Sequence, residues 1–459
     1  MKTSALKSFV LLCLFAVFSG GQAVSINPDG TGEVLIYPYY TARNNFNTSY
    51  SIVNTTAEAK AIKVRFLEGH QGVWMLDFNV YLGPFDVWTG ALIPTTSSLP
   101  PVTGEPSVMH LTNDLSCAPD LDKSGTEFLP DSLPAGADME RSTEGYLVVI
   151  EMGQVNGASA AAIQHDGTGT PNDCTSLETA WDNGGYWFND PNVDLSAPTG
   201  GLTGSLSLLN IAEGLAMGHD AVALSAFWQG DGMHTNPGNF FPHLGNAFPQ
   251  STLVTDQGIE SFNWINGYEA VSAVLMSESI LNQYDLSPFL IAFSEWVLNF
   301  PTKRFHTASE FDVPAPFSNY GDDVCINAQL HVYDPNTLTL PEQSLLLCGT
   351  VGILEFLSMG DTPGSQTAFL GSALFDNAMT SSGGNDSNGW GRLSFAQGSQ
   401  AMITNDDRLL TGLPVVGFQT NKYTNSNAQV GILATYAKLV PHSHSRSITD
   451  DLIFADDLD

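Results

Sequence analysis

Basic residues are scarce in this 459-residue chain, which has 15 lysine and arginine residues against 48 aspartate and glutamate residues and a formal charge of −33. Such a charge repels phosphate backbones and anionic lipid surfaces, so binding to nucleic acid or to a membrane surface is not expected. Long apolar stretches are also missing after residue 23. The sequence therefore predicts that the mature chain does not insert into a membrane.

Catalytic signatures are missing as well. The chain has no His-Glu-x-x-His pair, no Gly-x-Ser-x-Gly elbow, no P-loop and no dinucleotide fingerprint. Glu151 and Glu295 are two of several acids that lie in or beside apolar segments, where burial would raise a carboxyl pKa as glycoside hydrolysis requires. His442 and His444 flank one serine near the chain end and are interpreted as surface residues or as metal contacts. The missing motifs favour a non-catalytic protein, and the acids in apolar segments leave an enzyme as the alternative.

Residues 1–23 have the pattern of a secretory signal peptide. Lys2 and Lys7 precede an apolar run from Phe9 to Phe18, and small residues follow as far as Ala23. The run is too short to span a membrane. We therefore expect cleavage near Val24 and a secreted protein, in the periplasm, at the cell surface or outside the cell.

Cysteine is rare, and only four of the five residues remain after cleavage of residues 1–23. An even number of cysteines in an exported chain predicts disulfides, and four cysteines allow three pairings. We expect the sequence-local pairing, Cys117 with Cys174 and Cys325 with Cys348, because each half of the chain then carries its own bond.

Short alternating segments predict a mainly β protein. Apolar residues alternate with polar ones over residues 62–66, 76–82 and 85–89, and strands are also expected at 34–37 and 50–53. Five short strands at this spacing are typical of an immunoglobulin-like β-sandwich, here with long decorated loops. The pattern over 267–284 fits a helix or a strand. The predicted organisation is a signal peptide (1–23), a sandwich domain (24–254), a second β-rich domain or a continuation of the same sandwich (255–440), and an acidic tail (441–459).

Residues 51–56, 64–69, 85–90 and 300–305 resemble segments of a group of exported, functionally uncharacterised proteins of Gram-negative bacteria. The likeness extends over most of the chain and includes no catalytic motif. It implies an exported bacterial β protein and transfers no functional residue.

One acidic segment has the spacing of a calcium-binding loop. Oxygen-bearing residues recur through residues 120–131, with Gly125 at the sharp turn, and a hard cation requires six or more oxygen ligands. The sequence therefore predicts a Ca²⁺ site, with a solvated acidic loop as the alternative. Its ligands would be Asp120, Asp122, Ser124, Thr126 and Asp131.

A second loop combines aromatic residues with an acid and an amide, namely Trp181, Asp182, Asn183, Tyr186 and Trp187. Flat rings stack on sugar C–H faces while acids and amides bind hydroxyls, so the loop is a candidate glycan contact. The alternative is a satellite core beneath the loop. We expect a non-catalytic exported protein that binds an extracellular or cell-surface ligand. The alternatives are a glycan-binding or glycan-hydrolysing protein and a subunit that assembles with other copies of itself through the segment 24–31 or the tail.

Overall fold

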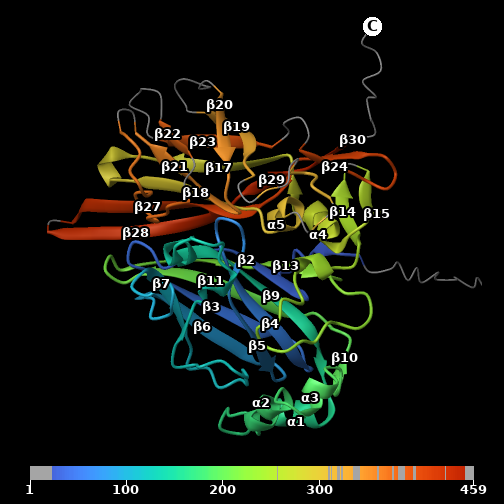
Figure 1. Ribbon diagram of the computed structural model, residues 1–459. Coiled ribbons are helices and arrows are strands. Elements are labelled where there is room, and N and C mark those ends of the chain that lie inside the picture. Colours follow the sequence, from blue (N-terminus) through green and yellow to red (C-terminus); the bar gives the residue numbers. More distant parts are fainter. Residues whose placement is uncertain are drawn as a thin grey trace, which may run out of the picture.

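The computed structural model describes residues 23–255, 257–308, 311, 313–317, 321, 324–333, 342–358, 361–374, 377–380, 388–395, 400–429 and 431–449. The fold is mainly β, as the sequence predicts, and nearly all of its strand pairs are antiparallel. The N-terminal half forms one body of sheets, and the C-terminal half forms a second body stacked upon it (Figure 1). The predicted signal peptide lies outside the described residues, except for Ala23.

The first body is a sandwich of two sheets. The seven-stranded sheet has the order β1-β13-β2-β9-β4-β5, with β10 beside β9, and the six-stranded sheet has the order β12-β11-β3-β6-β7-β8. The strands of the seven-stranded sheet are Ser25–Ile26 (β1), Val34–Thr41 (β2), Ala59–Glu68 (β4), Trp74–Leu82 (β5), Glu144–Val155 (β9), Leu195–Ser196 (β10) and Val222–Ser225 (β13). Those of the six-stranded sheet are Phe46–Asn54 (β3), Val87–Thr96 (β6), Pro106–Leu111 (β7), Thr126–Glu127 (β8), Leu202–Asn210 (β11) and Leu215–Asp220 (β12).

The alternation seen in the sequence places one face of each strand in the core between the two sheets. Phe66 on β4 contacts Tyr50 on β3 at a ring distance of 5.5 Å, and Phe78 on β5 lies 5.9 Å from Trp88 on β6. The predicted strand 85–89 begins only at Val87, because Phe85 adopts a left-handed backbone conformation in the preceding turn (φ 56°). The other four predicted strands lie within β2, β3, β4 and β5.

The second body is also built from two facing sheets. The inner sheet has the order β22-β21-β18-β27-β28, and the outer sheet has the order β20-β19-β23-β17-β29. The inner strands are Phe293–Asn299 (β18), Val351–Leu357 (β21), Asn377–Thr380 (β22), Val416–Gln429 (β27) and Ile432–Pro441 (β28). The outer strands are Ser279–Asp285 (β17), Ile326–Tyr333 (β19), Gln343–Leu347 (β20), Asn388–Ser394 (β23) and Ser443–Ser445 (β29).

The central strand of the inner sheet, β18, is buried on both faces. Trp296 and Leu298 on β18 point into the core between the two sheets of the second body, whereas Val297 joins the core of the first body. Phe418 on β27 likewise contacts Tyr39 on β2, at a ring distance of 6.5 Å. The two bodies therefore share a continuous core, with the inner sheet as the layer between them.

Smaller elements surround the sheets. The helices are Gly157–Ile163 (α1), Cys174–Ala180 (α2), Tyr186–Asn189 (α3), Gly267–Leu275 (α4) and Lys303–Thr307 (α5), with single 3-10 turns at Pro130–Ser132, Met139–Thr143, Leu244–Asn246 and Pro288–Leu290. The remaining strands are Gln250–Thr255 (β14), Gly258–Asn263 (β15), Met276–Ser277 (β16), Ala401–Ile403 (β24), Leu409–Thr411 (β25), Leu413–Pro414 (β26) and Ser447–Thr449 (β30). No helix in the described ranges is long and apolar enough to cross a membrane.

The disulfides have the predicted pairing, Cys117 with Cys174 and Cys325 with Cys348. The predicted domain boundary at residue 255 falls at the turn between β14 and β15. The predicted tail contributes strands as far as Thr449, since β29 pairs with β17 and β30 pairs with β25. The segment 24–31 supplies β1, which pairs with β13 of the same chain.

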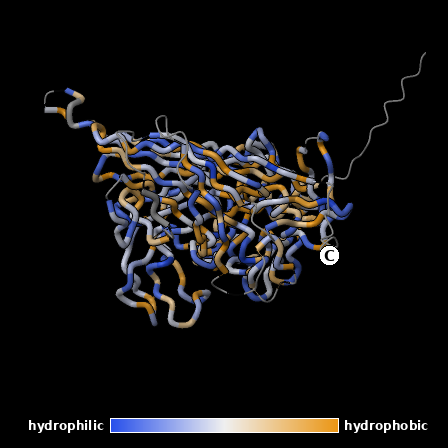
Figure 2. Tube along the Cα trace, turned by 90° about the horizontal axis from the view of Figure 1, so that it is seen from above, coloured by the Kyte–Doolittle hydropathy of each residue, from blue (hydrophilic) through white to orange (hydrophobic). Residues whose placement is uncertain are grey.

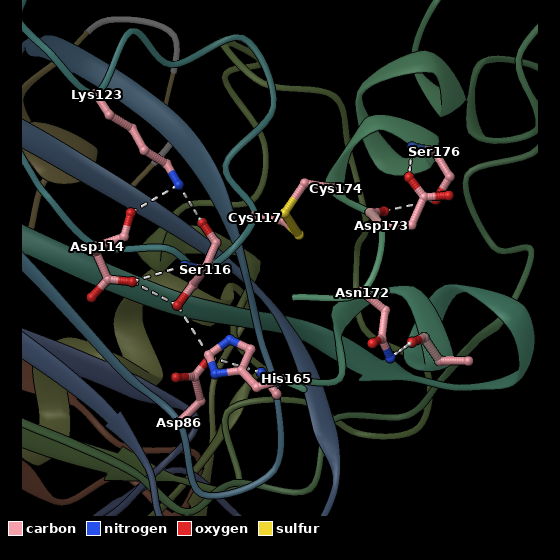
Figure 3. The surroundings of a disulfide bond; sticks show 12 residues. Asp86, Asp114, Ser116, Cys117, Lys123, His165, Asn172, Asp173, Cys174 and Ser176 are labelled. Atoms are coloured by element: carbon pink, nitrogen blue, oxygen red, sulfur yellow. Dashed lines mark hydrogen bonds and ion pairs between the residues drawn. A yellow bond between two sulfur atoms is a disulfide. The ribbon is translucent and has the colours of Figure 1, made fainter. Parts of the chain in front are cut away.

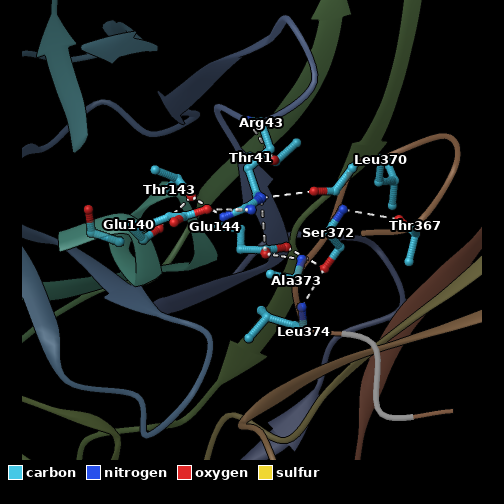
Figure 4. A network of polar contacts seen from close by, with 12 residues as sticks. Thr41, Arg43, Glu140, Thr143, Glu144, Thr367, Leu370, Ser372, Ala373 and Leu374 are labelled. Atoms are coloured by element: carbon cyan, nitrogen blue, oxygen red, sulfur yellow. Dashed lines mark hydrogen bonds and ion pairs between the residues drawn. The ribbon is translucent and has the colours of Figure 1, made fainter. Parts of the chain in front are cut away.

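A buried polar network joins the two bodies at the loop 367–374 (Figure 4). Glu144 on β9 accepts hydrogen bonds from Ser372 Oγ at 2.6 Å and from the backbone N–H of Ala373 at 2.8 Å. Glu295 on β18 accepts hydrogen bonds from Thr367 Oγ1 and from the N–H groups of Phe369 and Leu370. One loop of the second body is therefore fixed by carboxylates from both bodies.

The β27–β28 hairpin extends beyond the sheets as an arm, which we define as residues 416–429 and 431–441. It projects from the body at the left of Figures 1 and 2. On β28, Leu433 is 63% exposed and Tyr436 is 46% exposed, and β28 pairs only with β27 among the described strands. The arm therefore presents a partly apolar strand edge to solvent.

Candidate functional site

The candidate site is a cavity of about 460 Å³ between the two bodies. The first body contributes β1, Pro38 of β2, β12 and β13, and the second contributes the end of α4, β16, β27 and the segment around β29. Ligand pockets of proteins commonly have volumes of 300–1,000 Å³ and often lie between domains. We call this space the histidine cavity, after His219, His442 and His444 in its lining.

His219 has a nitrogen atom without a partner. The residue occupies an inward position on β12 and is 9% exposed. Its Nδ1 lies 3.2 Å from the backbone oxygen of Asp220, whereas its buried Nε2 has no hydrogen-bond partner among the described residues. Burial lowers the pKa of His219 to about 4, so the ring is neutral at pH 7. Because a carbonyl can only accept, Nδ1 carries the proton and Nε2 is a free acceptor.

His442 and His444 lie on the opposite side of the cavity and are already bonded. His442 Nε2 donates to the backbone oxygen of Val297 at 3.0 Å, and its Nδ1 lies 3.0 Å from Asn282 Nδ2. Its pKa falls to about 3 because the ring is buried. His444 Nδ1 lies 2.8 Å from Ser277 Oγ. In the described part of the chain no carboxylate is bonded to His444, so this serine–histidine contact lacks the orienting acid of a catalytic triad.

Arg446 supplies the cation of the cavity. Its guanidinium donates to the backbone oxygens of Val274 at 2.8 Å and Met276 at 3.5 Å, at the end of α4. No ion pair joins it to an acid within the described ranges. The walls beside it are apolar and include Val222, Met276 and Phe418. The lining of the cavity thus combines a histidine that has an unpartnered buried acceptor, a cation without an acidic partner and apolar surface.

A narrower pocket lies between β4, β5 and α5, but its basic residues are already engaged. Arg65 Nε donates to Asp77 at 2.6 Å, while Nη1 and Nη2 donate to carbonyls of the loop 239–242. Lys63 Nζ donates to Asp77 and to carbonyls of the same region. The pocket volume is about 30 Å³, against about 460 Å³ for the histidine cavity. These basic residues therefore hold a loop on the sheet.

The predicted calcium loop is only partly assembled. Asp122 Oδ1 accepts hydrogen bonds from the Ser124 N–H and hydroxyl, and Thr126 Oγ1 donates to the Asp122 carbonyl. Asp120, Asp122 and Asp131 are all exposed. Among the described residues, no group of three or more histidine, cysteine or acidic side chains is placed to hold a metal ion. The Ca²⁺ site remains a prediction.

The predicted glycan loop folds partly inward. Trp187 is buried, stacks on Tyr81 at 4.9 Å and donates to the Val193 carbonyl, and Trp181 donates to the Tyr81 hydroxyl. Tyr186 is half-buried, whereas Asp182 and Asn183 are exposed. The structure thus separates the ring of Trp187 from the two polar residues, and glycan binding by this loop remains a prediction.

The Cys117–Cys174 bond ties α2 to the end of the first sandwich (Figure 3). Near it, Asp86 Oδ2 lies 3.1 Å from Ser116 Oγ and 3.3 Å from His165 Nε2. The acid is thus the middle member, whereas a Ser-His-Asp triad requires the histidine between serine and acid. This cluster joins two loops and is not an arrangement for nucleophilic attack.

Sequence reasoning missed His219 and Arg446 and treated His442 as a surface or metal-contact residue. A signal for His219 was present, because Leu215, Met217 and His219 occupy alternate positions of one short strand. A histidine at an inward position of such a strand is a candidate for a buried polar role. No signal in the sequence placed β12 beside the segment of residues 442–446. No family model, no curated protein and no solved structure matches this chain.

Proposed function

We propose that this protein is an exported, non-catalytic binding protein that holds a small ligand in the histidine cavity. The observation that carries the proposal is a cavity of about 460 Å³ whose lining includes His219, a residue with a buried Nε2 that has no partner among the described residues. A buried polar atom without a hydrogen bond costs about 1–3 kcal/mol. A ligand that donates a hydrogen bond to this atom would remove that cost.

The lining indicates the chemistry of the ligand. His219 Nε2 requires a hydroxyl or N–H donor, Arg446 favours a carboxylate or another anion, and Val222, Met276 and Phe418 favour an apolar body. A hydroxylated aliphatic carboxylate has all three features. The acidity of the whole chain does not prevent binding, because a cation at the wall of a low-dielectric cavity acts on its ligand at close range.

The test uses three matched probes: 3-hydroxydecanoate, decanoate and the methyl ester of 3-hydroxydecanoate. We expect the hydroxy acid to bind at least ten-fold more tightly than either of the other two, measured by calorimetry and by the rise in melting temperature. His219→Leu should abolish the preference for the hydroxyl group, and Arg446→Gln should abolish the preference for the acid over the ester. Equal affinities in both variants and in the wild type, or no binding of any probe, would contradict the proposal.

Export and the scaffold belong to the same proposal. The N-terminal pattern of residues 1–23 and the two disulfides support a secreted protein. Two antiparallel sheets that face each other across Trp88 support an immunoglobulin-like sandwich. N-terminal sequencing of protein recovered from the periplasm and the medium tests export, and a start far from Val24 would contradict it.

A second candidate function is self-assembly, and the arm is the observation that favours it. The arm contains two lysines and no acidic residue, although the whole chain has a charge of −33. An exposed strand edge can pair with another chain, and Lys438 on β28 would meet an acidic surface on a second copy, whereas Lys422 already pairs with Glu213 of the same chain.

A further inference from the structure

A second cavity, of about 530 Å³, lies beside the start of β1 and is separate from the histidine cavity. Its lining is made of small and mostly polar residues, among them Ser25, Thr31, Gly200 and Thr252. Glu33, which directly precedes β2, is the one acidic residue in that lining, and no basic residue lines it. We call this space the Glu33 pocket.

Glu33 is a buried carboxyl group that lacks a cation. It is 8% exposed, and its Oε2 accepts a hydrogen bond from the Trp228 N–H at 3.0 Å. Lys60, whose charge acts on Glu33, donates instead to Glu151 at 2.8 Å. No ion pair of Glu33 occurs within the described residues. Burial raises the pKa of Glu33 to about 7, and the negative charge of Glu151 acts in the same direction, while the positive charge of Lys60 opposes it.

The surroundings of Glu33 fit a small cation with several hydrogen-bond donors. The lining of the pocket includes five hydroxyl-bearing residues, Ser25, Thr31, Thr199, Ser225 and Thr252, and a Cβ added at Gly200 would meet the Glu33 side chain only at 3.8 Å. An ammonium group has three donors and a compact charge, so it can bond to a carboxylate and to neighbouring oxygens at once. A divalent metal ion would require more acidic ligands than this single carboxylate provides.

We propose that the Glu33 pocket binds a primary ammonium group. One source of that group is the chain itself. Ala23 lines the pocket and is buried, and the backbone nitrogen of the next residue, Val24, donates to the Gln250 carbonyl at 2.9 Å. Cleavage after Ala23, as the sequence predicts, would vacate the space of that residue and convert the Val24 nitrogen into an α-ammonium group at the border of the pocket. The other source is a free amine.

The experiment has one part for each source of the ammonium group, and neither part involves the histidine cavity. In the first part, the mature protein is labelled with an amine-reactive reagent at pH 7.5. The labelling of its α-amine is quantified by mass spectrometry after proteolysis. If the pocket holds the α-ammonium, folded protein should be labelled at least ten-fold more slowly than protein unfolded in urea. Glu33→Gln keeps the acceptor for Trp228 and should restore fast labelling.

In the second part, methylammonium is added to the mature protein, with tetramethylammonium and sodium as controls. If a free amine is the occupant, the α-amine should be labelled at the unfolded rate, and methylammonium should raise the melting temperature more than either control. The rise should be larger at pH 8 than at pH 5.5, because Glu33 must be ionised, and it should vanish in Glu33→Gln. Fast labelling of the folded α-amine together with equal effects of the three cations would overturn the proposal.

Discussion

His219 and His442 face the same cavity from different bodies, and their ring nitrogens differ in one respect. Both nitrogens of His442 are hydrogen-bonded, whereas Nε2 of His219 is not. Replacing a bonded histidine with leucine leaves its partners unsatisfied, while replacing an unbonded one removes a cost that is already present. The two rings are therefore a matched pair, because both are buried and neutral.

We predict opposite effects of the same substitution at these two positions. His442→Leu should lower the free energy of unfolding by about 1–3 kcal/mol, because Asn282 and the Val297 carbonyl lose a partner. His219→Leu should leave the stability of ligand-free protein unchanged or slightly higher, since only the bond to the exposed residue Asp220 is lost. Urea unfolding of both variants measures the difference. A loss at position 219 as large as at position 442 would indicate that His219 is a structural residue.

The predicted Ca²⁺ site depends on a few acidic residues of one loop. If the loop 120–131 binds Ca²⁺, the melting temperature should be higher in millimolar Ca²⁺ than in chelator. At a free Ca²⁺ concentration of 100 times Kd, the bound ion would stabilise the folded protein by about 2.7 kcal/mol. The double substitution Asp120→Asn and Asp122→Asn should remove this effect without harming the chelated protein, because it relieves repulsion between acids. Mg²⁺ should substitute poorly. Equal melting temperatures of the wild type in chelator and in Ca²⁺ would leave an acidic surface loop.

Among the elements, strands were predictable where only one face carries apolar residues. The alternation over residues 62–66 located β4 because the inward positions are apolar and the outward ones are Lys63 and Arg65. The same rule fails for β18, whose two faces enter two different cores, so its sequence does not alternate. The ambiguous segment 267–284 contains both α4 and β17. The useful signal there was Asn266 followed by Glu269, which form a capping box at the start of α4.

The arm gives a prediction for an element. If its edge pairs with a second copy, the apparent mass in gel filtration should rise with protein concentration, and the rise should weaken with added salt. Leu433→Lys should reduce this association at least several-fold. Ile265→Lys is the matched control, since Ile265 is also exposed but lies between β15 and α4. A monomer at every concentration would argue against assembly through the arm.

At the scale of the whole molecule, both disulfides should be complete if the chain is exported. Thiol titration of unfolded, unreduced mature protein should find no reactive cysteine. The two bonds close loops with sequence separations of 57 and 23 residues, and loop entropy grows only with the logarithm of length. Each bond should therefore contribute a similar amount, about 3–4 kcal/mol in the loop-closure model. Two or four reactive thiols would refute the pairing in the mature protein.

Lowering the pH should destabilise the fold already at pH values well above the ordinary pKa of carboxyl groups. Several histidines have pKa values lowered by burial from 6.5 to about 3 or 4, namely His110, His219, His234, His243, His306 and His442. Between pH 6.5 and 4 the unfolded chain binds protons at these residues and the folded chain does not, so their contribution to stability is lost as the pH falls.

Five carboxyl groups whose pKa values are raised by burial oppose this trend, namely Glu33, Glu151, Glu269, Glu295 and Glu355. Burial raises the pKa of Glu33 and of Glu295 to about 7, so their contribution to stability is complete below pH 4.5 and is lost as the pH rises through 7. Because the histidines are more numerous, the urea midpoint should fall between pH 7.5 and pH 5. A midpoint that stays constant or rises over this interval would contradict the analysis.

The position of β29 has a consequence for the order in which the protein is completed during synthesis. The strands of the first sandwich end at Ser225, whereas the second body is closed by residues 443–449, which pair with β17 and β25. The first sandwich can therefore fold on a nascent chain long before translation ends. The histidine cavity cannot, because His219 emerges early while His442 and Arg446 are among the last residues to leave the ribosome. A truncated product that ends between residues 226 and 441 would keep all strands of the first sandwich but lack His442 and Arg446 of the cavity, so binding would distinguish finished molecules from such fragments.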